Sequence, residues 1–225
     1  MIISTYIEDN NYLHSEDERK LLAIEKADNV IYEYKSDYNN ISIIESCIGR
    51  ILLFDDTYQG GNIKYNGYYG GMPYTRYYHM AKSINNNIKN ILILGLGSGS
   101  VVKDCIKIYD YQSIDIIDID SYVIDAAYKY FDLPENDSVK VFCEDARDYI
   151  FYTNKLYDLI IVDVFVAKGM PYKFMTKEFI SQAFNILTNE GIIGVNLFGT
   201  DNLSDPLNDI FKSEYKTYNE VFSNL

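Results

Sequence analysis

The second half of the chain alternates short apolar runs with longer stretches of mixed polarity. The apolar runs predict strands at 91–94, 114–119, 139–142, 159–165 and 192–198. The stretches between them predict helices near 100–109, 121–131, 146–154 and 173–188. Strands this apolar are buried on both faces, and strands that alternate with helices form a parallel sheet. We therefore predict a doubly wound, parallel-rich α/β fold for this part of the chain.

The pattern before residue 57 is different. Between residues 30 and 57, apolar and polar residues alternate with a period of two in V-I-Y-E-Y, I-S-I-I-E-S and I-L-L-F-D, and turn residues separate these runs. This alternation is typical of half-buried strands joined by tight turns. It predicts a small N-terminal antiparallel β domain.

Two further segments belong to the N-terminal part. Residues 58–78 are crowded with Gly, Tyr and Asn, which predicts a mobile loop that closes over a ligand, with a low-complexity linker as the alternative. Residues 1–28 are polar, and Ser15 with Glu18 forms a capping box that predicts one short helix. We therefore divide the chain into 1–80, the β-rich domain with its gating loop, and 81–225, the doubly wound domain.

Composition narrows the classes of partner and site. The chain has 20 Lys+Arg against 33 Asp+Glu, a net charge of −13, so a nucleic acid would be repelled. Three cysteines are too few for a disulfide framework, and two histidines leave little for a metal site. The N-terminus lacks a signal-peptide pattern, and no apolar run approaches the length of a membrane span. We expect a cytoplasmic protein without a metal and without a nucleic-acid or membrane partner.

A glycine-rich turn, Gly95-Leu96-Gly97-Ser98-Gly99, follows the first strand of the α/β part and leads into a helix. Such a turn lets the backbone approach a ligand, and an acid at the end of the next strand can accept hydrogen bonds from both ribose hydroxyls. Asp118 and Asp120 stand at that place. The pattern predicts a nucleoside site, although Asp120 fits a helix-capping role better.

Two more acids, Asp145 and Asp163, fall at strand ends. Asp163 lies inside the apolar run L-I-I-V-D-V-F, where a carboxylate costs desolvation energy unless it is paired or used. Ligands of open α/β sheets bind at the carboxyl ends of the strands. We therefore predict a functional role for Asp163, with a structural hydrogen-bond acceptor as the alternative.

An ordered set of residues, spread over roughly 30–199, is shared with a known family. The set comprises Tyr38-Asn39-Asn40-Ile41, Gly49-Arg50-Ile51-Leu52-Leu53-Phe54-Asp55-Asp56, Gln59, Tyr77, Gly95-Leu96-Gly97-Ser98-Gly99, Asp118-Ile119-Asp120, Glu144-Asp145-Ala146 and Asp163. In this order the residues resemble the spermidine synthases, which are polyamine aminopropyltransferases. The resemblance implies a Rossmann-like fold of the S-adenosylmethionine-dependent methyltransferase type behind a small β domain.

The resemblance also implies roles for the donor-binding residues. Gln59 and the turn from Gly95 to Gly99 would hold a sulfonium nucleoside, either decarboxylated S-adenosylmethionine or S-adenosylmethionine itself, as co-substrate. Asp118 would bind its ribose, and Asp145 the adenine amino group. Ala146 would contribute a backbone contact to the same ring.

For the acceptor, the resemblance implies that Asp163 and Tyr77 orient and deprotonate an attacking amine such as putrescine. Dimer formation is implied only by the resemblance.

Several positions depart from the family pattern. Ser98 stands where the family has an acid that pairs with the donor's amine, Val166 stands at the second Asp of the Asp-Ser-Ser-Asp-Pro motif, and His79 replaces an acid. Residues 57–103 contain no Asp or Glu, while Arg76 favours a carboxylate partner, with a surface salt bridge as the alternative. We therefore keep two alternatives to aminopropyl transfer to a small amine: a methyltransferase or related transferase with a non-polyamine acceptor, and a catalytically silent nucleoside-binding module.

Overall fold

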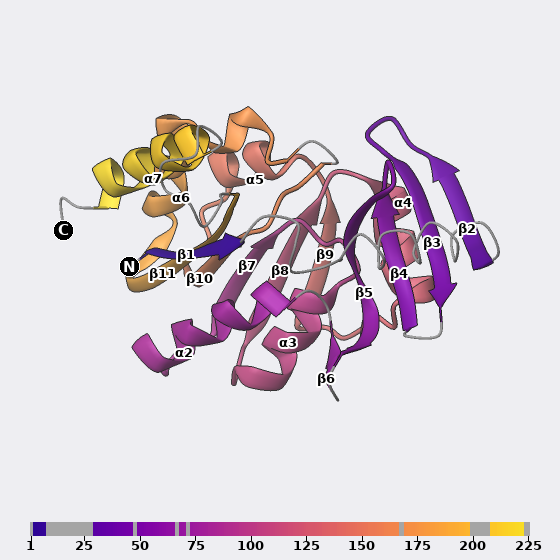
Figure 1. The fold of residues 1–225 in the computed structure, drawn as a ribbon. Coiled ribbons are helices and arrows are strands. Elements are labelled where there is room, and N and C mark those ends of the chain that lie inside the picture. Colours follow the sequence, from indigo (N-terminus) through magenta and orange to yellow (C-terminus); the bar gives the residue numbers. More distant parts are fainter. Residues whose placement is uncertain are drawn as a thin grey trace.

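The computed structural model describes residues 2–7, 29–46, 49–65, 68–70, 73–166, 169–198 and 208–222. These residues form two sheets that lie next to each other (Figure 1). The larger sheet has six strands in the order β1-β11-β10-β7-β8-β9, and the smaller has five in the order β2-β3-β4-β5-β6.

The larger sheet confirms the predicted α/β fold. Its strands are β1 (Ile2–Ile7), β7 (Asn90–Leu94), β8 (Ser113–Asp118), β9 (Val139–Cys143), β10 (Tyr157–Val162) and β11 (Leu187–Phe198). All neighbouring strands in it run parallel. The helices are α2 (Met80–Ile84), α3 (Ser100–Ile108), α4 (Ser121–Tyr130), α5 (Ala146–Tyr152), α6 (Lys177–Asn185) and α7 (Asn208–Phe222), with 3₁₀ segments η2 (Pro73–His79) and η3 (Tyr172–Phe174).

Both faces of this sheet are covered, which is why its strands are so apolar. One face packs against residues of α2 and α3, such as Ala81 and Val102. The opposite face packs against α5, α6 and α7, with Ile150, Phe179 and Tyr218 fully or almost fully buried.

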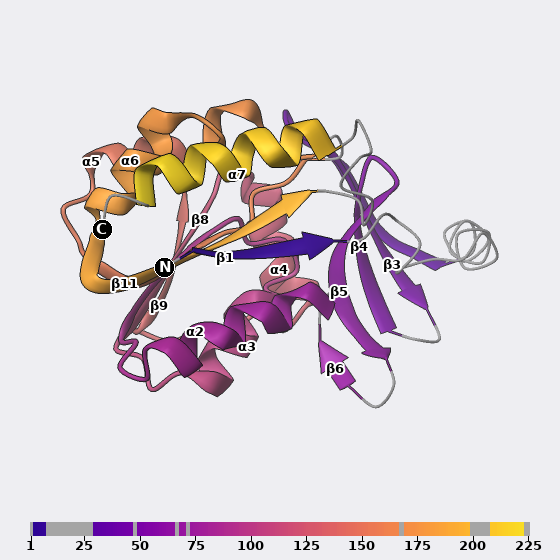
Figure 2. The ribbon, with the colours of Figure 1, turned by 60° about the vertical axis from the view of Figure 1, so that its left-hand side comes forward.

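Strand β1 lies at the edge of the larger sheet, beside β11 (Figure 2). The pairing is parallel and begins with Ile2 opposite Ile193. Our division of the chain placed this segment with the N-terminal β-rich part, so in this respect the structure differs from the expectation. The helix expected from Ser15 lies outside the described residues, and the boundary at residue 80 stays a prediction.

The smaller sheet confirms the predicted antiparallel domain. It consists of β2 (Val30–Lys35), β3 (Asn40–Ser46), β4 (Gly49–Phe54), β5 (Thr57–Tyr65) and β6 (Tyr68–Gly70), all paired antiparallel. One face packs on α4, the helix that follows β8 of the larger sheet. The core between this face and α4 comprises Ile41, Ile43, Leu52, Phe54, Val123, Ala126 and Phe131.

The expectation of a loop over 58–78 was wrong for most of its length, because β5 and η2 occupy it. The glycines were interpreted as loop residues, but Gly61 allows β4 and β5 to approach each other closely. A Cβ at this position would lie 2.2 Å from the Arg50 carbonyl oxygen. The β4–β5 register shifts next to this contact, because Leu52 lies opposite Gly60 whereas Leu53 lies opposite Tyr58. Glycine in a strand is typical of such bulges and contacts.

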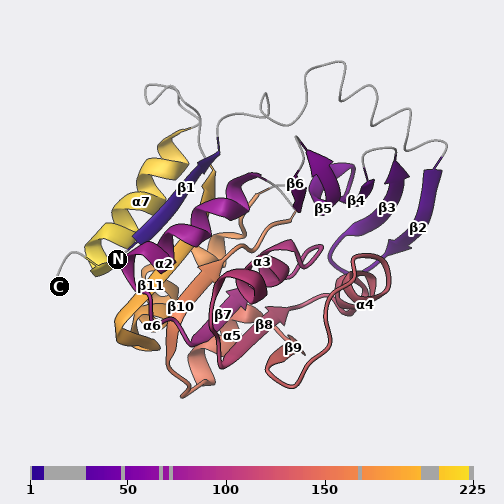
Figure 3. The ribbon, with the colours of Figure 1, turned by 90° about the horizontal axis from the view of Figure 1, so that it is seen from below.

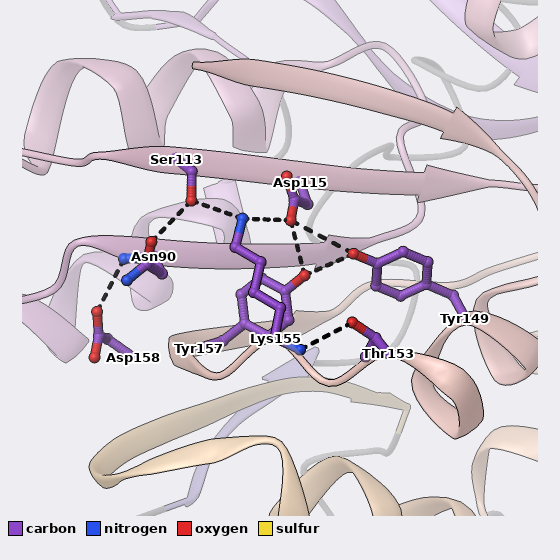
Figure 4. A network of polar contacts seen from close by, with 8 residues as sticks. All are labelled: Asn90, Ser113, Asp115, Tyr149, Thr153, Lys155, Tyr157 and Asp158. Carbon is purple, nitrogen blue, oxygen red and sulfur yellow. Dashed lines mark hydrogen bonds and ion pairs between the residues drawn. The ribbon is translucent and has the colours of Figure 1, made fainter. Parts of the chain in front are cut away.

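A polar network is buried in the amino-terminal half of the larger sheet (Figure 4). Asp115 on β8 is 4% exposed, and its Oδ2 accepts hydrogen bonds from the Lys155 ammonium at 2.6 Å and the Tyr157 hydroxyl at 2.8 Å. The Tyr149 and Tyr157 hydroxyls lie 2.7 Å apart. The network joins β8, α5 and β10 at the end of the sheet opposite the strand ends where ligands bind.

Candidate active site

The glycine-rich turn lies at the carboxyl end of β7, as predicted, and leads into α3. Gly95, Gly97 and Gly99 all have positive φ. Gly95 is required by a close approach, because a Cβ there would lie 2.2 Å from the backbone oxygen of Asp163. The turn after β7 and the turn after β10 are therefore in direct backbone contact.

Asp118, at the end of β8, faces this turn. Its carboxylate accepts hydrogen bonds from the backbone N–H groups of Leu96 at 2.9 Å and Asp120 at 3.0 Å. Burial raises its pKa to about 6, although these hydrogen bonds oppose the shift. Each carboxylate oxygen can accept more than one hydrogen bond, so Asp118 can still bind a ribose hydroxyl.

Asp120 caps the N-terminus of α4, which is the helix-capping role that the sequence favoured over ribose binding. Its side chain accepts a hydrogen bond from the backbone N–H of Tyr122 at 3.0 Å and another from the Ser36 hydroxyl at 2.5 Å. It is 2% exposed and ties the smaller sheet to the start of α4.

Asp145 follows β9 and caps α5, which begins at the buried Ala146. Its Oδ1 accepts a hydrogen bond from the backbone N–H of Arg147 at 2.8 Å, and its Oδ2 is paired with the ammonium of Lys173. Burial acts to raise the pKa of Asp145, but the Lys173 and Arg147 hydrogen bonds outweigh it and lower the pKa below its ordinary value. Lys173, on η3, was not among the predicted site residues.

Asp163 lies directly after β10 and is held by two side chains from other elements. The Tyr74 hydroxyl on η2 lies 2.9 Å from Oδ2 and 3.1 Å from Oδ1, and the Asn196 amide on β11 donates to Oδ1 at 2.9 Å. Burial raises the pKa of Asp163, and the hydrogen bonds from Asn196 and Tyr74 oppose the shift. Within the described residues, no Lys or Arg forms an ion pair with this carboxylate.

Tyr74 and Asn196 were missed in the sequence. The pKa of Tyr74 is raised well above its ordinary value by burial and by the charge of Asp163, so its hydroxyl stays a donor. Tyr77, which the resemblance singled out, is 50% exposed on the same 3₁₀ segment. The one available signal for Asn196 was a polar residue inside the apolar run I-I-G-V-N-L-F.

Gln59 and Ser98 lie where β5 meets the glycine-rich turn. Ser98 is 3% exposed, and its hydroxyl is 2.8 Å from that of Ser100, which donates to the Gly61 carbonyl at 3.2 Å. The backbone oxygen of Gln59 would lie 3.9 Å from a Cβ at Gly97. The Ser98 hydroxyl therefore packs toward β5.

The remaining predicted residues lie around this core. Arg76 is exposed on η2. Val166 pairs with Gly169 through a backbone N–H to oxygen hydrogen bond of 3.1 Å. His79 Nε2 lies 3.7 Å from the buried carboxylate of Asp104.

Two other features are absent from the part of the chain that the structure describes, a metal-binding cluster and a membrane-spanning helix. No three His, Cys, Asp or Glu side chains gather there as a metal site requires. No helix there has the length and apolar character to cross a membrane.

Strands β10, β7, β8 and β9 lie side by side in this order in one sheet (Figure 3). Asp118, Asp145 and Asp163 follow or end β8, β9 and β10, so all three lie at the carboxyl edge of this part of the sheet. Asp118 and Asp145 offer acceptors for hydroxyl and amino groups. Asp163, with its raised pKa and no partner cation among the described residues, can hold an ammonium group and accept its proton.

Comparison with known sequences places the chain in a family. A family model described as a spermine/spermidine synthase domain matches residues 74–202. The chain is 31% identical over 202 residues to a polyamine aminopropyltransferase from Vibrio vulnificus and 29% identical over 171 residues to one from Methanocaldococcus jannaschii. These matches take in 86% and 73% of this chain but only 65% and 56% of the two relatives.

Solved structures share the fold. Spermidine synthase from Thermotoga maritima superimposes with a TM-score of 0.67 at 22% identity, over 87% of this chain and 65% of that one. A spermidine synthase in complex with the transition state analogue AdoDATO gives 0.67 at 23% identity, over 87% and 66%. Human methyltransferase-like protein 13 in complex with SAH gives 0.55 at 24% identity, over 65% and 70%.

Proposed function

The chain belongs to the spermine/spermidine synthase family, and on this basis we propose that it transfers an aminopropyl group from decarboxylated S-adenosylmethionine to a small amine. The observation that carries the proposal is Asp163: a buried carboxylate at the carboxyl end of β10 that receives Tyr74 and Asn196 but no cation among the described residues.

The donor nucleoside binds across the strand ends in this proposal. Asp118 accepts hydrogen bonds from the ribose hydroxyls, Asp145 accepts one from the adenine amino group, and the Ala146 N–H donates to ring nitrogen N1. The supporting facts are the position of Asp118 against the glycine-rich turn and of Asp145 at the next strand end. The raised pKa of Asp118 still leaves it ionised at neutral pH.

The reaction is a displacement at the carbon beside the sulfonium. The amine lone pair forms the new C–N bond, the C–S bond breaks, and its electron pair stays on sulfur, which leaves as the neutral thioether 5′-methylthioadenosine. A primary amine with a pKa near 10.4 is less than about one part in a thousand neutral at pH 7, so a base is needed. Asp163 takes that proton, and the Tyr74 and Asn196 hydrogen bonds fix the orientation of its carboxylate.

A direct test follows the transferred group. The protein is incubated with decarboxylated S-adenosylmethionine and a panel of mono- and diamines, and mass spectrometry measures the alkylated amine and 5′-methylthioadenosine in equal amounts. Asp163→Asn is the matched control and should form both about 1,000-fold more slowly. Failure to form either product with every amine, while the nucleoside binds, would remove the aminopropyl proposal and leave its two alternatives, a transferase that uses intact S-adenosylmethionine and a silent module.

Ser98 favours a second candidate, a transferase that uses intact S-adenosylmethionine. Ser98 is buried and bonded to Ser100, so it cannot replace an acid that pairs with the donor's amine. No Asp or Glu occurs from residue 57 to 103. Calorimetry with the two donors separates the candidates, because tighter binding of the intact form would remove the aminopropyl proposal.

The proposal carries two minor corollaries. The substrates are small intracellular metabolites, so we expect the protein in the cytoplasm. Self-association through the smaller sheet stays a prediction, to be measured by light scattering.

A further inference from the structure

Lys173 is held in place at the edge of the proposed nucleoside site. The Arg147 guanidinium donates hydrogen bonds to the backbone oxygen of Lys173 at 2.5 Å and to the Thr176 hydroxyl at 3.0 Å. The neighbouring Phe174 is 2% exposed and packs edge-on against Phe179 at 5.1 Å. The backbone of η3 is therefore fixed, and the Lys173 ammonium extends from it to Oδ2 of Asp145.

The pair is open to a ligand. The Lys173 side chain is 39% exposed and that of Asp145 is 24% exposed. An exposed ion pair of this kind adds about 0–1 kcal/mol to stability, so stability alone gives it little value. An ammonium has three donors and a carboxylate oxygen has two acceptor positions, so each group keeps hydrogen-bonding capacity for a third partner.

We propose that Lys173 donates a hydrogen bond to ring nitrogen N7 of the adenine whose amino group Asp145 accepts. This inference rests on the proposed function. The adenine amino group lies between N1 and N7, and both ring nitrogens are acceptors. The proposed function assigns N1 to the Ala146 N–H, and an ammonium can only donate, so N7 is the complementary partner on the other side of the carboxylate.

With this assignment, Asp145 and Lys173 together recognise the base. The carboxylate requires a donor on the base, and the ammonium requires an acceptor next to it. Adenine meets both requirements, whereas a base with a carbonyl oxygen in place of the amino group places that oxygen against the carboxylate.

The test measures the contribution of N7 directly. Calorimetry compares 5′-methylthioadenosine with its 7-deaza analogue, in which carbon replaces N7, on the wild-type protein, Lys173→Met and Lys177→Met. The wild type should bind the 7-deaza analogue about tenfold more weakly, since a hydrogen bond to a charged group is lost. Lys173→Met should bind both compounds equally, about tenfold more weakly than the wild type binds 5′-methylthioadenosine.

Lys177 is the matched control. It is an exposed lysine on α6, 3.8 Å from Glu220, and its replacement should leave the tenfold preference for N7 intact. Lys173→Arg keeps a donor and should keep the preference, which covers the case in which Lys173→Met does not fold.

Four outcomes would overturn the inference. Equal binding of both compounds by the wild type would show that N7 makes no such contact, while the proposed nucleoside site would remain supported. Weaker binding by Lys173→Met with the N7 preference intact makes Lys173 only a support for Asp145. Tighter binding by Lys173→Met makes it a competitor of the base. No binding of either compound by the wild type ends both this inference and the proposed nucleoside site.

Discussion

Two buried aspartates in the same parallel sheet are satisfied in different ways. Asp115, in the amino-terminal half of β8, receives the Lys155 ammonium and the Tyr157 hydroxyl from its own chain. Asp163, at the carboxyl end of β10, receives a hydroxyl and an amide, and within the described part of the chain no cation pairs with it. Its pKa is raised by burial.

In the proposed function, this difference separates a structural carboxylate from a catalytic one. A buried charge is costly unless a partner compensates it, and the chain supplies that partner for Asp115. At Asp163 the compensating cation is absent from the described residues, and in the proposed function the substrate amine brings it. Four experiments test this contrast.

The largest expected effect is the loss of turnover in Asp163→Asn. An amide cannot accept the ammonium proton, so product formation should fall about 1,000-fold, within the range for a lost general base. Mass spectrometry of the alkylated amine measures the loss, and circular dichroism checks folding. Activity within tenfold of the wild type would show that Asp163 is not the base.

Asp115→Asn should instead reduce stability. It leaves the Lys155 ammonium without its carboxylate, and because that side chain is 37% exposed we expect a loss of about 2 kcal/mol, below the usual range for a broken buried pair. Thermal denaturation should show a Tm lower by about 5 °C. Turnover per folded molecule should stay within about twofold of the wild type. A large loss of turnover with an unchanged Tm would contradict the structural role.

Tyr74→Phe tests which tyrosine serves Asp163. It removes a hydrogen bond to a charged group, so kcat/KM should fall about 30-fold. Tyr77→Phe is the control and should change kcat/KM less than about twofold, because its exposed ring makes no such bond in the structure. A larger effect at Tyr77 than at Tyr74 would restore the assignment that the resemblance implied.

The smallest effect concerns Asp118, a second carboxylate at the same sheet edge whose pKa is about 6. In the proposed function the ribose hydroxyls donate to its ionised form, so the affinity for 5′-methylthioadenosine should fall about tenfold at pH 5, one unit below that pKa. The effect on stability has the opposite sign. Because folding raises the pKa of Asp118, its protonated carboxyl group stabilises the folded state fully at pH values below the pKa in the unfolded chain. This stabilisation is lost as pH rises through about 6. Calorimetry between pH 5 and pH 8 measures the affinity, and Asp118→Asn should remove the dependence.

Much of the fold could be predicted because its signals are local. The apolar runs that became β7 to β11 and the helices between them follow from burial on both sheet faces, and the turn at Gly95 follows from its position after a strand. Asp163 could be singled out because burying a carboxylate in an apolar run costs desolvation energy unless the group is paired or used.

The parts that could not be predicted depend on contacts between distant segments. Glycine is needed at position 61 because the Arg50 carbonyl of the neighbouring strand lies too close for a Cβ. Local propensity does not reveal this contact, so β5 was predicted to be a loop. Tyr74 became the partner of Asp163 through the placement of η2 against β11, and 23 tyrosines in the sequence offer no way to choose it. Lys173 required the position of η3 beside α5.

The pairing of β1 with β11 has a consequence for how the protein is made. Ile2 lies opposite Ile193, so two strands far apart along the chain pair with each other. At the usual rate of synthesis, about 10–40 s pass between the two. During that time the nascent chain holds β1 without its partner, and a contact so distant in sequence closes late because of its loop entropy. The pair β1–β11 at the edge of the sheet therefore forms only after the strands from β7 to β10 have been synthesised.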